Sequence, residues 1–87
     1  RVNAAMNQQC IFNQDFKMNE AENAISCSCL HQGLRRQIFI VMPDGWQLDA
    51  WLAQVVEDGF FWEEEIEQAV AKEQFEEDGS IRLIGAA

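Results

Sequence analysis

The chain has 87 residues, which is the length of one domain with a small hydrophobic core. Hydrophobic residues make up 48% of it, and its nine aromatic residues (three Trp, six Phe, no Tyr) argue against a disordered chain. A formal net charge of −9 and a pI of about 4.3 disfavour direct binding to nucleic acid. We predict one domain over residues 1–87, with residues 1–6 disordered or derived from cloning and Met6 as a candidate natural start.

Cysteine content and hydropathy bear on the cellular location. Three cysteines cannot all pair within one chain, so we expect reduced thiols in a cytosolic protein. The N-terminal sequence lacks the apolar segment of a secretory signal, and no apolar run approaches the ~20 residues that span a membrane. We therefore expect a soluble cytoplasmic protein that makes no membrane contact.

The first segments are short. Residues 7–12 (NQQCIF) end in three apolar residues and predict a first strand. Residues 13–22 are mostly polar, with isolated Phe16 and Met18, and predict a connection held to the core by those two side chains, which could include a short helical turn.

Residues 24–42 (AISCSCLHQGLRRQIFIVM) predict a β-hairpin that turns at Gln32 and Gly33. Apolar and small hydroxylic residues alternate along its first strand, which therefore has one apolar face. The second strand has an almost continuous apolar run over residues 38–42. That run predicts a central strand that is covered on both faces, or covered on its second face by a partner.

A helical period follows residues 42–45, where Pro43 ends the strand and Asp44 is expected to cap a helix over residues 46–57. Its apolar stripe consists of Leu48, Trp51, Leu52, Val55 and Val56. Asp58 and Gly59 predict its end. A second helix is expected over residues 63–75, then a turn over 76–79 and a last strand over 80–84.

The predicted order of elements is β-β-β-α-α-β. It describes an α+β domain in which two helices pack on one face of a small, mainly antiparallel sheet of three N-terminal strands and one C-terminal strand. Ile11 and Phe12, the polar segment after them, the strand at Ile25, then Gly33 and residues 38–40 resemble the start of a family of small bacterial domains of unknown function. The chain is also similar to compact single-domain proteins of mobile gene cassettes. Neither resemblance implies an activity.

Four residues offer metal or nucleophile chemistry. Cys27, Cys29 and His31 alternate along one strand, and Cys10 of the first strand could complete a zinc-ligand set. Side chains two residues apart on a strand start ~7 Å apart, which is unfavourable for tetrahedral ligation. We therefore expect buried thiols, no metal and no cofactor. Cys29 and His31 are also the one nucleophile and base pair in the chain, but no second histidine or Gly-rich loop accompanies them.

Two charged features of the sequence are candidate binding sites. Arg35 and Arg36 could bind an anion, although pairing with neighbouring acids or solvation of the turn is the simpler interpretation. Residues 57–78 contain ten acids and one base, Lys72, so the segment would attract a basic protein partner. Its predicted acidic surface consists of Glu63, Glu64, Glu67 and Glu73, and a solvated helix face is the simpler interpretation of these glutamates.

Five aromatic residues are crowded into 17 positions, namely Trp46, Trp51, Phe60, Phe61 and Trp62. A core of this size cannot easily cover all of them, so we expect an exposed patch that forms a homodimer interface. The function predicted first is thus a small, acidic, non-enzymatic interaction or regulatory domain. One alternative is an acidic nucleic-acid mimic that inhibits a DNA-binding protein. The other is an enzyme or small-ligand carrier with an aromatic groove and Cys29 and His31 as polar groups.

Overall fold

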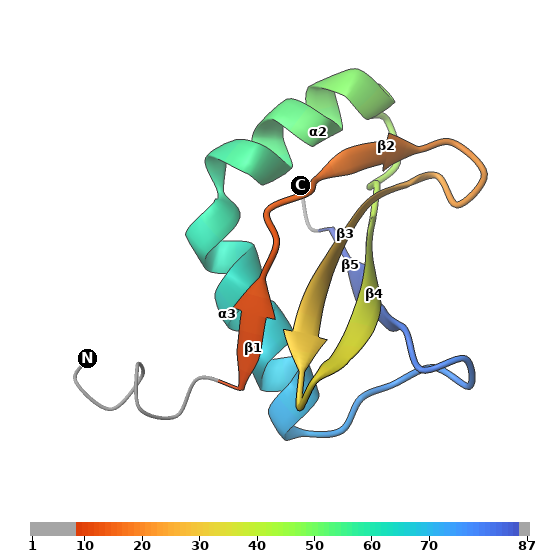
Figure 1. Cartoon of the computed structure of the whole chain (residues 1–87). Coiled ribbons are helices and arrows are strands. Elements are labelled where there is room, and N and C mark those ends of the chain that lie inside the picture. Colours follow the sequence, from red (N-terminus) through yellow and green to blue (C-terminus); the bar gives the residue numbers. More distant parts are fainter. Residues whose placement is uncertain (1–8, 86–87) are drawn as a thin grey trace.

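A computed structural model describes residues 9–85, and these residues form an α+β domain (Figure 1). Five strands make one sheet in the order β1-β3-β4-β5, with β2 also paired to β3, and only β5 is parallel to its neighbour. Two helices lie on one face of the sheet. The elements are β1 (Cys10–Phe12), β2 (Lys17–Asn19), β3 (Ala24–His31), β4 (Leu34–Val41), α2 (Leu48–Glu57), α3 (Gly59–Ala71) and β5 (Ile81–Ile84). The predicted fold class is confirmed; residues 1–6, expected to be disordered, lie outside the described part.

The hairpin of β3 and β4 is the centre of the sheet, as predicted. Its two turn residues both have positive φ, 54° at Gln32 and 79° at Gly33, which gives the tight turn that matches the twist of antiparallel strands. Ile25, Cys27 and Cys29 lie on the face toward the helices. β4 lies between β3 and β5, so it is the central strand that its apolar run indicated.

The edge formed by β1 and β2 is irregular. Phe12 pairs with Cys29 and Lys17 with Ser26, so the four residues 13–16 lie opposite only two residues of β3. The expectation of a connection over residues 13–22 was wrong for residues 17–19. β2 has no apolar alternation to reveal it, because it is an exposed edge strand held by its backbone pairing to β3.

The helices differ from their predicted bounds at three points. α2 starts at Leu48 with Gln47 as its N-cap and no side-chain cap, so the expected cap by Asp44 was wrong; Asp44 lies in a turn before it. One residue, Asp58, separates α2 from α3, and the chain bends sharply there (Figure 1). α2 ends at Glu57, as predicted, but α3 begins after this single intervening residue, because Asp58 bonds to both helices: its N–H donates to Gln54 and its carbonyl accepts from Trp62. α3 then ends at Ala71.

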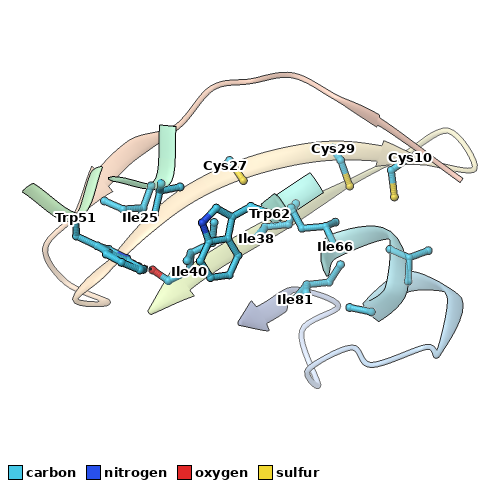
Figure 2. Close-up of a cluster of buried hydrophobic side chains, with 13 residues drawn as sticks. Cys10, Ile25, Cys27, Cys29, Ile38, Ile40, Trp51, Trp62, Ile66 and Ile81 are labelled. Atoms are coloured by element: carbon cyan, nitrogen blue, oxygen red, sulfur yellow. Dashed lines mark hydrogen bonds between the residues drawn. The ribbon is translucent and has the colours of Figure 1, made fainter. Parts of the chain in front are cut away.

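The core lies between the helices and the sheet (Figure 2). Ile25, Ile38 and Ile40 of the hairpin pack against Trp51 of α2 and Trp62 of α3. The two indole rings meet edge to face at 6.2 Å, and the Trp51 Nε1–H donates to the carbonyl of Ile40 at 3.3 Å. These contacts fix the direction of both helices and so decide which helical residues face outward.

Candidate interaction surface

The five aromatic residues predicted as an interface separate into two groups. Trp51 and Trp62 are 2% and 6% exposed and belong to the core. Trp46 is half-buried and packs its ring edge-on against Trp51 at 5.1 Å. Phe60 and Phe61 are 89% and 57% exposed. The surface part of the predicted interface is therefore the pair of phenylalanines at the start of α3.

Three exposed apolar residues flank the bend between α2 and α3 in the sequence, namely Val56, Phe60 and Phe61. Val56, in the last turn of α2, is 54% exposed. The bend at Asp58 resets the helical phase, so that Trp62 rather than Phe60 points inward. Phe61 rests its ring on Trp62 at 5.0 Å, whereas Phe60 extends into solvent. We call Val56, Phe60 and Phe61 the elbow patch.

The elbow patch lies in an acidic stretch of the chain. Residues 46–71 contain seven carboxylates and no Lys, Arg or His. Glu57 and Asp58 are exposed at the bend itself, between Val56 and Phe60 in the sequence. The basic residues of the described chain lie elsewhere: Lys17, Arg35, Arg36 and Arg82 are on strands, and Lys72 follows α3. The helical side of the domain is thus electronegative.

The predicted acidic surface is not uniform. Both carboxylate oxygens of Glu67 accept backbone hydrogen bonds, from Gln9 N–H at 2.9 Å and from Cys10 N–H at 3.0 Å. This glutamate therefore ties α3 to the start of β1. Glu63 and Glu64 are half-buried and Glu73 is exposed. The sequence carries no signal for the role of Glu67, because the strand it holds is 57 residues away in the chain.

The three cysteines are free thiols inside the core, and Cys10 and Cys29 lie next to each other (Figure 2). Burial, followed by the charges of Asp15 and Cys29, raises the pKa of the Cys27 thiol to about 12. Burial likewise raises the pKa of the Cys10 and Cys29 thiols. All three are therefore protonated near neutral pH and are poor nucleophiles.

His31 lies at the same end of the core as Cys29. It is 7% exposed, its ring centre is 6.1 Å from that of Phe75, and its Nδ1 has no hydrogen-bond partner within residues 9–85. No group of three or more His, Cys, Asp or Glu side chains in that range is arranged to hold a metal ion.

Arg35 and Arg36 point to opposite faces of β4, as neighbours on a strand must. Arg35 reaches Asp15 at 3.7 Å on the face away from the helices. Arg36 stacks its guanidinium over Phe75 at 4.1 Å and donates to the carbonyl of Gly79 at 3.2 Å. The pair is thus divided between two structural contacts.

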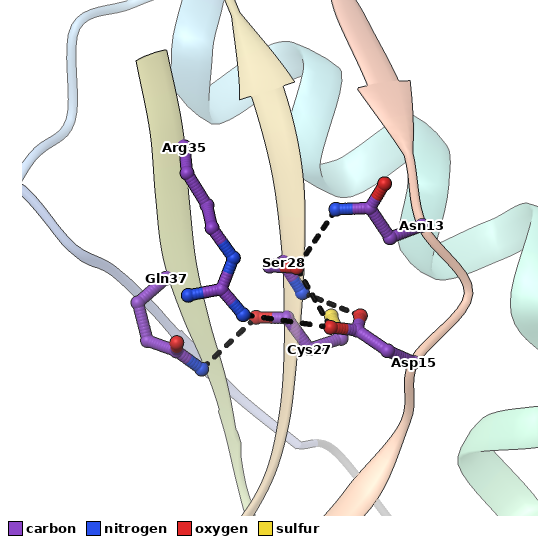
Figure 3. Close-up of polar contacts among 6 residues, drawn as sticks. All are labelled: Asn13, Asp15, Cys27, Ser28, Arg35 and Gln37. Atoms are coloured by element: carbon purple, nitrogen blue, oxygen red, sulfur yellow. Dashed lines mark hydrogen bonds and ion pairs between the residues drawn. The ribbon is translucent and has the colours of Figure 1, made fainter.

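Asp15 is a polar anchor that the sequence did not reveal. Its carboxylate accepts from the N–H of Ser28 at 2.8 Å and from the Ser28 hydroxyl at 2.7 Å (Figure 3). Asn13 donates to the same hydroxyl at 2.9 Å. Burial alone would raise the pKa of Asp15, but the bonds from Ser28 and the charge of Arg35 hold it below its usual range. The side chain replaces the strand pairing that residues 13–16 interrupt.

The comparisons with known proteins identify a fold. No family model and no curated protein matches the chain. A crystal structure of a protein of unknown function from the DUF1488 family of Shewanella loihica PV-4 is similar, with a TM-score of 0.76 and 20% sequence identity. The match covers 87% of this chain and 92% of that one. Within residues 9–85, neither helix has the length and apolar character needed to cross a membrane. At this identity, the likeness to a bacterial protein shows a shared fold alone.

Proposed function

We propose that the chain is a small non-enzymatic interaction domain that binds a basic protein partner through the elbow patch. The observation that supports this is the 89% exposure of Phe60, beside the exposed Val56 and Phe61. Aromatic side chains that fill a pocket of a partner contribute most of the energy of many interfaces. An exposed apolar group of this kind in a small domain favours a contact surface over a merely solvated one.

The charge around the patch supports a basic partner over a second copy of this chain. A two-fold contact through the elbow patch would bring Glu57 and Asp58 toward their own copies, and like charges across an interface are unfavourable. A partner segment with apolar residues flanked by Lys or Arg has the complementary pattern. Homodimerisation through the aromatic residues, which the sequence suggested, is therefore the less favoured occupant of this surface.

The other two candidate functions depend on different residues. A nucleic-acid mimic would bind through the carboxylates of residues 57–78, and Phe60 would add nothing to that binding. An enzyme or ligand carrier would use Cys29 and His31, but burial raises the pKa of the Cys29 thiol and so opposes nucleophilic chemistry. An interaction domain is the one of the three functions that would use the exposed apolar residues of the elbow patch.

The test uses a synthetic amphipathic helical peptide with leucines on one face and lysines on the other. We expect it to bind and to shift the amide signals of residues 56–61 in a two-dimensional NMR spectrum. Phe60→Ser should weaken binding about tenfold, which is the scale of one buried aromatic anchor. Leu34→Ser is the matched control, because Leu34 is a 60% exposed leucine in the hairpin, remote from the patch.

A peptide with glutamates in place of the lysines should not bind. If Phe60→Ser binds the basic peptide as tightly as the parent protein does, the elbow patch is not the contact surface. Weakening by Glu63→Gln and Glu65→Gln together, without an effect of Phe60→Ser, would favour the mimic.

A further inference from the structure

The strand β5 leaves one regular edge of the sheet open. Within the described chain β5 pairs with β4 alone, in the register Ile38 to Ile81 and Val41 to Ile84. The N–H of Gly85 donates to the carbonyl of Val41 at 3.0 Å. Because backbone groups alternate sides along a strand, Ile81 and Leu83 also bond toward β4. The N–H and C=O groups of Arg82 and Ile84 therefore point away from the sheet.

The opposite edge has no such regular row. Residues 13–16 separate β1 from β2, and the side chain of Asp15 occupies the Ser28 N–H there. Interruptions and charges of this kind prevent edge-to-edge pairing. β5 has no proline and no interruption, and its Ile84 is 72% exposed.

We propose that β5 pairs antiparallel with β5 of a second copy of this chain, about a two-fold axis at Leu83. Arg82 then lies opposite Ile84 of the second copy, and Ile84 opposite its Arg82. These are hydrogen-bonded pairs, so the contact contains four backbone hydrogen bonds. The pairing is self-complementary and uses the open groups of both copies at once.

The side chains at the edge suit this arrangement. Arg82 forms an ion pair with Glu22 of its own chain and places its guanidinium over Phe39 at 5.1 Å. Its charge is therefore compensated, and its side chain is directed over β4 rather than toward the second copy. The two copies of Arg82 do not meet as unpaired like charges.

The β5 strand itself carries no acidic side chain, since its four residues are Ile81, Arg82, Leu83 and Ile84. Glu67 of α3, by contrast, is bonded to the start of β1, which lies at the opposite edge of the sheet. A contact at β5 therefore brings no carboxylate of that strand against its own copy. A contact of four-residue strands is small, so we expect a weak dimer that forms with rising protein concentration.

Disulfide trapping tests the register. In the proposed pairing the two Leu83 residues face each other as a non-hydrogen-bonded pair, with Cα atoms ~4.5 Å apart, within the range a disulfide spans. The two Arg82 Cα atoms are offset by two residues and lie ~8 Å apart, which is too far. With oxidised glutathione as oxidant, Leu83→Cys should form covalent dimers at least ~10-fold faster than Arg82→Cys. The three native thiols are buried and serve as the background in the parent protein.

A proline variant tests the hydrogen bonds. Ile84→Pro removes an outward N–H and no bond of the ladder to β4, so it should abolish both the trapping of Leu83→Cys and the dimer seen by sedimentation. Ile84→Thr keeps the N–H and should retain the dimer. Equal trapping at positions 82 and 83, or a dimer that survives Ile84→Pro, would overturn the proposal. Phe60→Ser should change neither readout, so this test is independent of the elbow patch.

Discussion

Asp15 holds the sheet together at the point where its edge strand is interrupted. Its two bonds to Ser28 satisfy a backbone N–H and a hydroxyl, and Ser28 is 1% exposed. A buried donor that loses its acceptor costs about 1–3 kcal/mol. We predict that Asp15→Ala lowers the free energy of unfolding by about that amount in urea titrations. Glu20→Ala is the control, an exposed acid in the turn after β2 whose removal should change stability by less than ~0.5 kcal/mol.

The same residue predicts a pH dependence. The pKa of Asp15 is held below its usual range in the folded protein, so its stabilising contribution is complete above the unfolded value of about 3.9. It is lost as the pH falls through the folded pKa. The stability difference between the parent protein and Asp15→Ala should therefore shrink below about pH 4. A difference that stays constant down to pH 2 would contradict the assignment.

The sequence alone could not show that the carboxylates of Asp15 and Glu67 accept hydrogen bonds from the backbone of the sheet. Asp15 lies in a polar segment that is typical of a connection, and its partner Ser28 is 13 residues further along the chain. Glu67 is one of many glutamates, and only the fold brings it to the backbone of Cys10. A charge reversal that included Glu67 would remove the bonds that hold β1, so it would not test surface charge alone.

Elements whose structure depends on neighbouring residues in the sequence, namely the β3–β4 hairpin and α2, were predicted correctly. The alternation of residues 24–29 and the Gln32 and Gly33 turn fixed the hairpin, and the stripe from Leu48 to Val55 fixed α2. β2 was missed because an exposed edge strand needs no apolar face. Trp62 is buried and Phe60 is exposed because the chain bends at Asp58. The residue types of Trp62 and Phe60 do not indicate that bend.

The close approach of β5 to α2 depends on a glycine. A Cβ at Gly85 would lie 2.4 Å from Trp51 Cζ2 and 2.7 Å from the carbonyl oxygen of Val41. We predict that Gly85→Ala destabilises the fold by about 1–3 kcal/mol, because a core indole or the ladder must shift. The matched variant is Gly59→Ala. Gly59 is the first residue of α3, and nothing lies within 4 Å of a Cβ added there. It should raise stability by roughly 0.5–1 kcal/mol.

Thermal unfolding of the two glycine variants measures both effects. Opposite shifts of the melting temperature are expected from the same chemical change. Equal melting temperatures would mean that the packing of Gly85 against Trp51 adds nothing to stability.

For the whole molecule, the arrangement of charge decides how the two proposed contacts combine. Residues 46–71, which include both helices, carry seven carboxylates without a base, and the strands carry most of the basic residues. A dimer joined at β5 would have its helices on the same side of one continuous sheet, with an elbow patch on each copy. The two contacts use different elements, so each dimer could hold two basic partners.

The two proposed contacts should respond differently to salt. Raising NaCl from 50 to 300 mM shortens the screening length from ~14 to ~6 Å, which weakens attraction between exposed carboxylates and a lysine-rich peptide. We predict that peptide affinity falls about tenfold over this range, whereas the dimer constant changes by less than about twofold, because backbone hydrogen bonds and Ile84 carry no net charge. Sedimentation and peptide titration in the same buffers measure the two constants. If both constants fall together, attraction between opposite charges also holds the dimer, and the contact is not the β5 pairing proposed here.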